Sequence, residues 1–579
     1  MAKLFVRFVR SDDVENFFTD NADIQWHFNH LDYQEVVGAI EDGYAQAGKY
    51  DDAPVSYEDA ISGYRTVLEM AGAIAAKEIA PLAADVDREG AHFENGKVTY
   101  AKGTLRAMDI LAKANLLGFT LPRQYQGLNF PGLLYSIAIE MISQADASLM
   151  NLFGLQDIAE TIHLFGDDTL KDRYLPQFAT GKVTGAMTLT EPDAGSDLQS
   201  VRLKAVPQED GTWRLFGVKR FITNGCADVS LVLARSEEGS IDGRGLSMFV
   251  CEKGPDLVIR RIEHKLGIHG SPTCELQFNG VPALLVGQRR LGLIRYVMSL
   301  MNGARVGVAC QGIGIAQAAY EEALKYARKR VQFKHPIIDF PAVYDILARM
   351  KSRIAVARAI TYEASRLVDL RRVLEIREEA GDVAVRARLR EVSSGASLLT
   401  PIAKAYASEM AIEVTYDAIQ IHGGTGYMQE FSVERLARDA RITTIYEGTT
   451  QLQVVAAIVG ITSGTLGNYL TQLGERAFRP DLMKLASLAR ESRERVAYCA
   501  MFLKNMNDRT YSELVARRLV DMASDALGAH LLLVQAEKDA SRTPLAAKVF
   551  ADVMPRIRMQ ADYITSGDKL VIEQRAALL

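Results

Sequence analysis

Several features that define other classes of protein are scarce or missing in this sequence. Its five cysteines are odd in number, far apart and never arranged as C-x-x-C, which argues against a disulfide scaffold and a thiolate zinc site. No apolar run approaches the roughly 20 residues that cross a bilayer. Lysine and arginine total 67 against 72 aspartates and glutamates, so no excess of positive charge exists to neutralise a phosphate backbone. We therefore expect no metal site, no membrane span and no nucleic-acid partner, and a reducing, cytoplasmic location.

The first ten residues, Met1 to Arg10, are basic and apolar, as in many targeting segments. Asp12, Asp13 and Glu15 follow at once, and no small-residue cleavage site is present. We therefore do not expect a cleavable leader.

The rest of the composition is that of a folded chain. Its 579 residues are 48% hydrophobic and 24% charged, which favours three to five structural units. Apolar spacing is mostly helical over 61–183, preceded by Ser56-Tyr-Glu-Asp59, a pattern typical of a helix start. Over 184–285, short β-branched or aromatic runs separated by turn residues predict an antiparallel β domain. Helical spacing returns over 286–460.

The order of elements is therefore helical, then β, then helical, with helical additions at 1–60 and 461–579. Strands are expected at 213–217, 229–234, 246–251 and 274–278. Ile461 to Gly467 is expected to be a linker, followed by a helix with one apolar face (Val515, Leu519, Met522, Ala523 and Ala526). Strand–helix alternation is missing, so a doubly wound nucleotide fold is not indicated. Gly312 and Gly314 lie inside a helical repeat and are interpreted as helix–helix contacts.

Three stretches could carry chemistry, although each alone also fits an ordinary structural role. Met187 to Asp197 places hydroxyls beside exposed backbone N–H groups, as in a pyrophosphate contact or a simple Gly/Ser turn. Ile421 to Tyr427 has three glycines in four residues, which suits close approach to a ligand or a helix C-cap. In Arg441 to Thr449, burial of Glu447 against Ile445 and Tyr446 would raise the pKa of its carboxyl, as a general base requires, unless it is a surface glutamate.

Taken together and in this order, these stretches resemble the acyl-CoA dehydrogenase family of flavoproteins, over about residues 65–460. The segments that carry the resemblance are Leu189-Thr-Glu-Pro-Asp-Ala-Gly-Ser-Asp197, Phe221-Ile-Thr-Asn-Gly225, Lys265-Leu-Gly267 with Ser271, Ala327-Arg-Lys-Arg-Val-Gln-Phe333, Gly423-Gly-Thr-Gly-Tyr427 and Asp439-Ala-Arg-Ile-Thr-Thr-Ile-Tyr-Glu-Gly-Thr449. The long ends are similar to those of a bacterial subgroup that includes the methylthiopropionyl-CoA dehydrogenases.

The resemblance implies an α+β multidomain fold. Its parts would be an N-terminal helical extension (1–60), an N-terminal helical domain (61–183), a middle antiparallel β-barrel (184–285), a C-terminal four-helix bundle (286–460) and a C-terminal helical extension (461–579). FAD would lie between barrel and bundle. The extension would cover the surface on which a second dimer docks in short family members, so a homodimer is expected.

The resemblance also implies the cofactor and substrate contacts. Phe221 and Thr223 would meet the isoalloxazine ring, and Arg330, Gln332 and Phe333 would reach FAD of the neighbouring subunit. The full set of expected FAD contacts is Met187, Leu189, Thr190, Gly195, Ser196, Phe221, Thr223, Arg330, Gln332, Phe333, Gln420, Gly423, Gly424, Thr449 and Gln451. The expected substrate contacts are Ser196, Arg305, Asn151, Gly154, Tyr446 and Gly448. Helix packing could equally explain the small residues at 151 and 154, and two positions depart from the family pattern, Met187 (usually aromatic) and Pro341 (often glutamine).

Glu447 matches the family's catalytic base, and Ala304 stands where some relatives place that base instead. In this family the glutamate removes the α-proton of an acyl-CoA, the β-hydride passes to flavin N5, and a trans-2-enoyl-CoA results. An electron-transfer flavoprotein would then take the electrons. Two alternatives remain: an acyl-CoA oxidase that uses oxygen, and a non-catalytic paralogue that binds CoA or flavin. The sequence does not name the acyl group or say whether decarboxylation follows.

Overall fold

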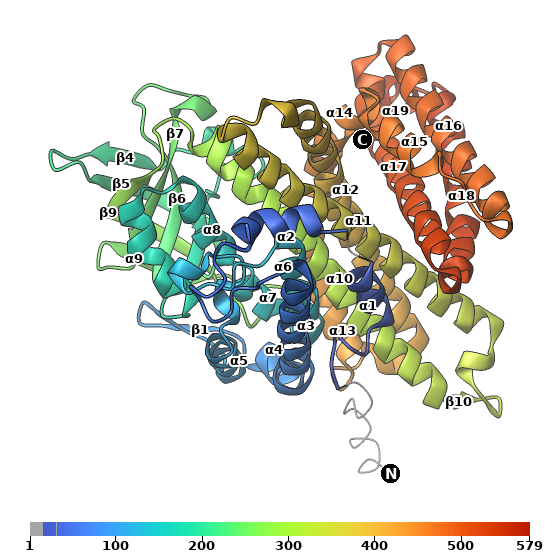
Figure 1. Cartoon of the computed structure of the whole chain (residues 1–579), viewed down its shortest axis with the longest axis horizontal. Helices are drawn as coiled ribbons and strands as arrows, with labels where there is room; N and C mark the ends of the chain where they lie inside the picture. Colours follow the sequence, from blue (N-terminus) through green and yellow to red (C-terminus); the bar gives the residue numbers. More distant parts are fainter. Residues whose placement is uncertain (1–14, 31) are drawn as a thin grey trace. The chain divides into compact units, whose positions relative to one another are not determined.

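The computed structural model describes residues 15–30 and 32–579, so the expectation about a leader concerns residues 1–14, outside the described part of the chain. The chain divides into two compact units, Met1–Gly307 and Val308–Leu579. Figure 1 traces their elements.

The first unit begins with helices. Ser56 caps α3 as its sequence predicts, because its Oγ accepts a hydrogen bond from the Asp59 N–H at 3.2 Å. Helix α6 is mostly apolar and is buried along almost its whole length, so it lies in the core of this unit. The helices are α1 (Ala22–Asn29), α2 (Gln34–Ile40), α3 (Tyr57–Ile74), α4 (Ala83–Glu89), α5 (Lys102–Lys113), α6 (Gly132–Ala145), α7 (Ala147–Phe153), α8 (Gln156–Phe165) and α9 (Asp168–Ala179), with a small hairpin of β1 (His92–Glu94) and β2 (Lys97–Thr99).

A β-barrel follows in the same unit. Its strands are β3 (Gly185–Thr188), β4 (Lys204–Pro207), β5 (Trp213–Thr223), β6 (Val229–Arg235), β7 (Leu246–Glu252), β8 (Leu257–Ile262) and β9 (Thr273–Val286). Pairing runs β6–β4–β5–β9–β7 and returns to β6, which closes the ring. The interior holds apolar side chains such as Leu215, Phe249 and Phe278. The predicted strands and barrel are confirmed, but the antiparallel prediction is wrong for β3, which pairs with β6 in parallel. β4 pairs antiparallel with β5 and makes one parallel bridge to β6.

The helices of the second unit follow the predicted pattern. They are α10 (Met298–Lys329, which begins in the first unit), α11 (Pro341–Glu379), α12 (Arg386–His422), α13 (Ser432–Ala440) and α14 (Thr450–Thr462), with a short hairpin of β10 (Val331–Gln332) and β11 (His335–Pro336) and a 3₁₀ turn, η13 (Arg441–Thr444). A Cβ atom at Gly312 would lie 2.9 Å from the Ala407 carbonyl oxygen of α12, so this glycine does permit close helix contact. Pro341 is the first residue of α11, where no N–H is needed.

The C-terminal extension is helical, as predicted, and comprises α15 (Thr465–Gly474), α16 (Met483–Met506), α17 (Arg509–Lys538), α18 (Thr543–Thr565), α19 (Leu570–Glu573) and α20 (Arg575–Leu578). The predicted apolar face of α17 is buried, with Val515, Leu519 and Met522 each 0% exposed. The predicted linker at 461–467 is wrong, because α14 continues to Thr462 and α15 starts at Thr465. Gly464 lies in the left-handed region (φ +92°) and makes the sharp turn between the two helices.

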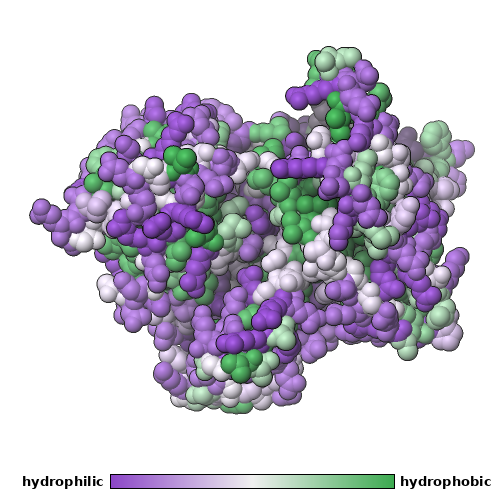
Figure 2. All heavy atoms as spheres, turned by 90° about the horizontal axis from the view of Figure 1, so that it is seen from above, coloured by the Kyte–Doolittle hydropathy of each residue, from purple (hydrophilic) through white to green (hydrophobic). Residues whose placement is uncertain are grey.

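Three general features complete the fold. Helix α17 is long and apolar enough to cross a membrane by length and composition, as are α14 and α15 counted as one bent span, but 89% of the apolar window of α17 is buried inside the structure. All five cysteines are buried free thiols. In the face drawn in Figure 2, hydrophilic residues predominate, with smaller hydrophobic areas between them.

Candidate active site

The loop between η13 and α14 carries Glu447 in an unusual backbone conformation. Glu447 has φ +54° and Gly448 has φ +86°, so both lie in the left-handed region. A side chain with a Cβ costs about 1 kcal/mol or more in that region, and such strain persists only where neighbouring contacts impose it. The Glu447 side chain is half-buried. The loop therefore holds its one carboxylate in a position that the backbone alone would not choose.

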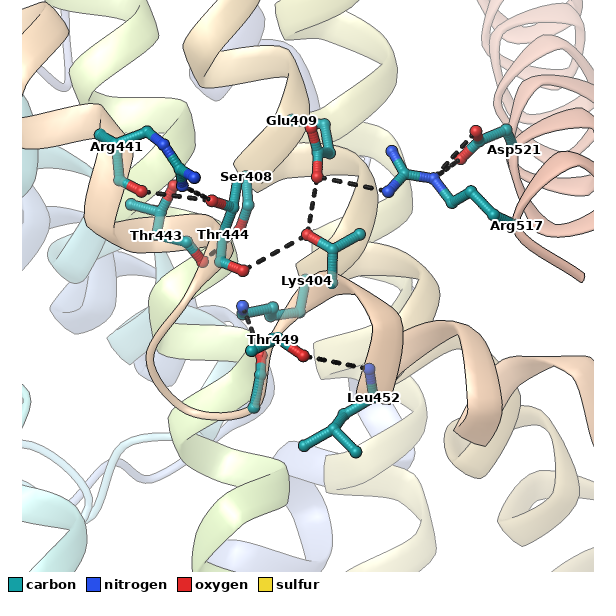
Figure 3. Close-up of polar contacts among 12 residues, drawn as sticks. Lys404, Ser408, Glu409, Arg441, Thr443, Thr444, Thr449, Leu452, Arg517 and Asp521 are labelled. Carbon is teal, nitrogen blue, oxygen red and sulfur yellow. Dashed lines mark hydrogen bonds and ion pairs between the residues drawn. The ribbon is translucent and has the colours of Figure 1, made fainter. Parts of the chain in front are cut away.

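Helix α12 supplies three side chains that hold this loop at separate points (Figure 3). The fully buried Lys404 donates from Nζ to the Gly448 carbonyl oxygen at 2.7 Å. Ser408, one helical turn later, donates to the Thr443 carbonyl oxygen at 2.9 Å. Glu409 accepts from the Thr450 hydroxyl at 2.7 Å. One face of α12 thus fixes the loop before and after Glu447.

Three further residues contribute hydrogen bonds at or beside the loop. Gln453 Nε2, in the first turn of α14, donates to the carbonyl oxygens of Glu447 at 3.2 Å and Gly448 at 3.0 Å. The Tyr446 hydroxyl donates to Gln311 Oε1 of α10. Burial raises the pKa of Tyr446 above its usual range, so this phenol stays neutral and remains a donor. Thr449 caps α14, its Oγ1 accepting from the Leu452 N–H at 3.4 Å.

The glycine turn after α12 leaves open space above the helix end. A Cβ atom at Gly423 or Gly424 would meet no atom within 4 Å, and Gly423 has φ +61°. His422, next to this turn, stacks on Tyr326 with ring centroids 4.2 Å apart, and burial lowers the pKa of its imidazole. Gln420 is exposed beside the turn.

A second exposed group lies at the end of α10, where Arg330 leads into the β10–β11 hairpin. Arg330, Gln332 and Phe333 are all exposed, Phe333 to 85%, and Phe333 has φ +51°. An apolar ring this exposed suits a contact with another molecule better than a place in this unit's own core.

In the first unit, a buried ion pair shapes the turn from Leu189 to Ser196. Lys219 of β5 is fully buried and donates from Nζ to the Leu189 carbonyl oxygen at 2.6 Å, and it lies 3.0 Å from Glu191 Oε1. Burial lowers the pKa of Lys219 to about 8. Glu191 also accepts from the backbone N–H groups of Arg202 at 2.8 Å and Leu203 at 2.9 Å.

The turn above this buried ion pair has polar residues at its surface. Gly195 and Ser196 are exposed, and a Cβ atom at Gly195 would touch only Thr190, at 4.0 Å. The Leu189 side chain, by contrast, points into the apolar core, and Met187 packs against that core from β3. Of the residues expected in this stretch, the structure thus brings Thr190, Gly195 and Ser196 to an accessible surface.

Phe221 and Thr223 lie at the end of β5. Phe221 has φ +59° at an irregularity in the β5–β9 pairing, and its side chain is 52% exposed beneath the Arg220 guanidinium, 4.6 Å from the ring centroid. Thr223 pairs with Thr273 at the end of the ladder. The β5 backbone therefore turns an aromatic ring outward at the edge of the barrel.

The expected substrate residues of the first unit lie among buried helices. Asn151 donates from Nδ2 to Ser271 Oγ at 3.1 Å, which joins α7 to the barrel. A Cβ atom at Gly154 would come within 3.1 Å of the Met150 carbonyl oxygen. Arg305 is 8% exposed, and its Nη1 donates to Asn302 at 3.4 Å. Asn151 and Gly154 therefore each have a contact within the protein at their position in this structure.

Comparison with known proteins identifies the family. Models of the acyl-CoA dehydrogenase N-terminal, middle and C-terminal domains match residues 63–182, 186–281 and 294–458, and a further acyl-CoA dehydrogenase C-terminal model matches 462–566. The 3-methylmercaptopropionyl-CoA dehydrogenase of Ruegeria pomeroyi is 36% identical over 461 residues, 74% of either chain. The chain belongs to the acyl-CoA dehydrogenase family.

Solved acyl-CoA dehydrogenases have the same fold. The butyryl-CoA dehydrogenase of Megasphaera elsdenii matches with a TM-score of 0.59 and 32% identity over 68% of this chain and 96% of that one. An acyl-CoA dehydrogenase of Bacillus anthracis in complex with FAD matches with a TM-score of 0.75 and 23% identity over 88% of this chain and 89% of that one. The helical, barrel and helical architecture expected from the sequence is thereby confirmed.

Acyl-CoA dehydrogenases are FAD-dependent oxidoreductases that act on the CH–CH bond of acyl-CoA thioesters, and this chain is one of them. Its residues fit the cofactor. Open space over Gly423 and Gly424 and an uncrowded turn at Gly195 allow the backbone to approach a phosphate or ring closely, and Phe221 offers an exposed aromatic face. Among the described residues, no group of three or more His, Cys, Asp or Glu side chains could hold a metal ion.

Proposed function

We propose that this acyl-CoA dehydrogenase converts an acyl-CoA to the trans-2-enoyl-CoA with Glu447 as the base that removes the α-proton. The observation that carries the proposal is the backbone at Glu447, which is held in the left-handed region (φ +54°) by hydrogen bonds to its own carbonyl and to that of Gly448. Backbone strain that is maintained by several contacts is typical of residues in active sites. In the family pattern this position is the base.

The residues around Glu447 then have defined tasks. Tyr446 stays neutral beside it and hydrogen-bonded to Gln311, so it adds no competing charge. The loop contacts keep the carboxylate in one place. Such preorganisation lowers the barrier to proton removal, because the entropy of orienting the carboxylate is already lost before the reaction step. FAD, when bound, supplies the acceptor for the β-hydride.

The contacts expected for cofactor and substrate are part of the same proposal. Thr190, Ser196, Phe221 and Thr223 would hold FAD from the barrel side, together with Met187, Leu189 and Gly195. The bundle would contribute Gln420, Gly423, Gly424, Thr449 and Gln451, and the neighbouring subunit of a homodimer Arg330, Gln332 and Phe333. Ser196, Arg305, Asn151, Gly154, Tyr446 and Gly448 would contact the acyl-CoA.

We propose further that an electron-transfer flavoprotein, rather than oxygen, reoxidises the flavin. The proposed location is a separate point: the free, buried cysteines support a reducing, cytoplasmic compartment. The relative from Ruegeria pomeroyi makes 3-methylmercaptopropionyl-CoA the first thioester to examine.

Anaerobic titration of the yellow holoenzyme with a panel of acyl-CoA thioesters tests the proposal. At least one saturated thioester is expected to bleach the flavin, with slow recovery in air and fast recovery on addition of an electron-transfer flavoprotein. Fast recovery in air with stoichiometric hydrogen peroxide would show an oxidase instead. A chain that purifies without flavin and binds none would show a non-catalytic paralogue.

A further inference from the structure

A row of polar contacts joins the C-terminal extension to the loop that carries Glu447 (Figure 3). Thr450, the first residue of α14, donates its hydroxyl to Glu409 Oε1 at 2.7 Å. The same oxygen lies 3.5 Å from Arg517 Nη1 of α17. Arg517 is held in turn by Asp521, whose two oxygens each accept from its Nε at 2.9 Å. The contacts therefore run from α17 through α12 to the start of α14.

Thr450 bridges the two ends of the loop. Its side chain is buried, at 7% exposure, and it follows Glu447 by three residues. Its hydroxyl also lies 3.4 Å from the carbonyl oxygen of Thr444, where the loop begins. A hydroxyl has only one proton, and the charged acceptor at 2.7 Å takes it more strongly than the distant carbonyl. The orientation of Thr450 thus depends on where the Glu409 carboxylate points.

Among the described residues, three arginines line the cavity beside Glu409, and two of them have other carboxylate partners. Glu409 lies in the wall of a cavity of about 240 Å³ that is also lined by Arg353, Arg517 and Arg556. Arg353 contacts Glu413, and Arg556 binds Asp525 through two hydrogen bonds of 2.7 and 3.0 Å. Arg517 lies 3.5 Å from Glu409, so α17 places a positive charge beside the carboxylate that binds Thr450.

The Arg517–Glu409 pair is too exposed to contribute much to stability. The two side chains are 39% and 38% exposed, and pairs of this kind add little to the free energy of folding. A small shift of a catalytic group, however, can change the rate by much more than it changes stability. Any effect of the pair should therefore be seen in turnover before it is seen in the melting temperature.

We propose that Glu409 and Arg517 are positioning residues that hold the Glu447 loop in its working conformation, so that the C-terminal extension takes part in catalysis. The proposal rests on the role of Glu447 proposed above. It gives the extension a task in the reaction besides covering a surface.

Steady-state kinetics of four single variants test the idea, with an electron-transfer flavoprotein or a dye as acceptor. Thr450→Val should lower kcat on the order of tenfold with KM within about twofold, because it removes the hydroxyl and keeps the shape. Thr450→Ser should restore most of kcat. Arg517→Met should lower kcat severalfold, whereas Arg558→Met, which removes a bidentate ion pair with Glu491 (2.8 and 2.9 Å) inside the extension, should leave kcat unchanged.

A double variant and an isotope effect separate positioning from general damage. Arg517→Met should add little to Thr450→Val, because both act through the same contacts. The isotope effect with an α-deuterated acyl-CoA should be larger in Thr450→Val than in wild type, since proton removal becomes slower. Equal FAD content shows that the variants are folded.

Unchanged kcat in Arg517→Met, additive effects in the double variant, or an equal loss in Arg558→Met would overturn the positioning role. Failure of the proposed function is a separate result. If Glu447→Gln keeps its turnover, the base is elsewhere, whereas an inactive Glu447→Gln with fully active Thr450→Val and Arg517→Met rejects only the positioning role.

Discussion

Glu447 and Gly448 both lie in the left-handed region, and their turn positions the Glu447 carboxylate. A substitution of Gly448 by alanine tests how much this turn matters. Gly448 has φ +86°, and a Cβ atom there would lie 2.7 Å from Gln453 Nε2, which binds the loop. Strain of this kind costs about 1–3 kcal/mol, and the added carbon would also displace the Gln453 side chain that binds the loop of Glu447.

Gly448→Ala is therefore expected to lower kcat at least about tenfold and to destabilise the chain by about 1–3 kcal/mol. The matched control is Gly464→Ala, at φ +92° with no atom within 4 Å of the added carbon. It should lose similar stability and keep its kcat. Steady-state kinetics and urea unfolding of both variants measure this, and equal kcat in the two would contradict the role of the turn.

At the residue scale, the sequence predicts which residue is the base but not the residues that hold its loop. Glu447 stands in a distinctive run of residues. Lys404, Glu409 and Gln453 belong to ordinary helical stretches, and their contacts with the loop depend on how α12 and α14 pack. Lys404 stands between alanines in an otherwise apolar stretch of α12. This position indicates a buried ammonium group, which needs a hydrogen-bond partner. The partner itself, a backbone carbonyl, has no sequence signature.

Among the elements, α17 carries a buried histidine whose charge state links pH to stability. His530 is 1% exposed, and its Nδ1 lies 2.8 Å from the Ala526 carbonyl oxygen. Burial lowers the pKa of His530 to about 4, from 6.5 when exposed. The unfolded chain therefore binds the proton more readily than the folded chain between these two values.

It follows that the contribution of His530 to stability is complete above pH 6.5 and declines as pH falls toward 4. The free energy of unfolding should drop by up to about 3 kcal/mol over this window, a loss that His530→Phe should not show. Urea titrations of both chains between pH 7 and 4 give the difference. If the free energy of unfolding changed with pH equally in both chains, the pKa of His530 would be the same in the folded and unfolded states.

Elements were predictable where a single period runs for many residues. The apolar face of α17 and the strands β5, β6, β7 and β9 follow directly from such patterns. The prediction of a linker at 461–467 is wrong because Gly, Ser and Thr are typical of loops. In the structure Leu466 packs in the core, and helices lie on both sides of Gly464. The parallel pairing of β3 with β6 depends on barrel closure, which no local pattern records.

At the scale of the whole molecule, the open question is how many chains assemble. Phe333 is 85% exposed at a hairpin expected to reach a neighbouring subunit, which favours a dimer. The C-terminal extension is expected to occupy the surface on which two dimers join in short family members. Light scattering of the purified holoenzyme should give the mass of two chains, and a mass of four would refute the expected covering role of the extension.

The proposed role of the Glu447 carboxylate is to accept the α-proton, and Glu447→Gln removes that ability. The amide has nearly the same shape but cannot accept the α-proton, so kcat should fall by about 10²–10⁴-fold. FAD content and the dissociation constant for acyl-CoA should stay close to those of wild type. Single-turnover reduction of the flavin by a thioester under nitrogen is the measurement. A rate within a few-fold of wild type would contradict the account.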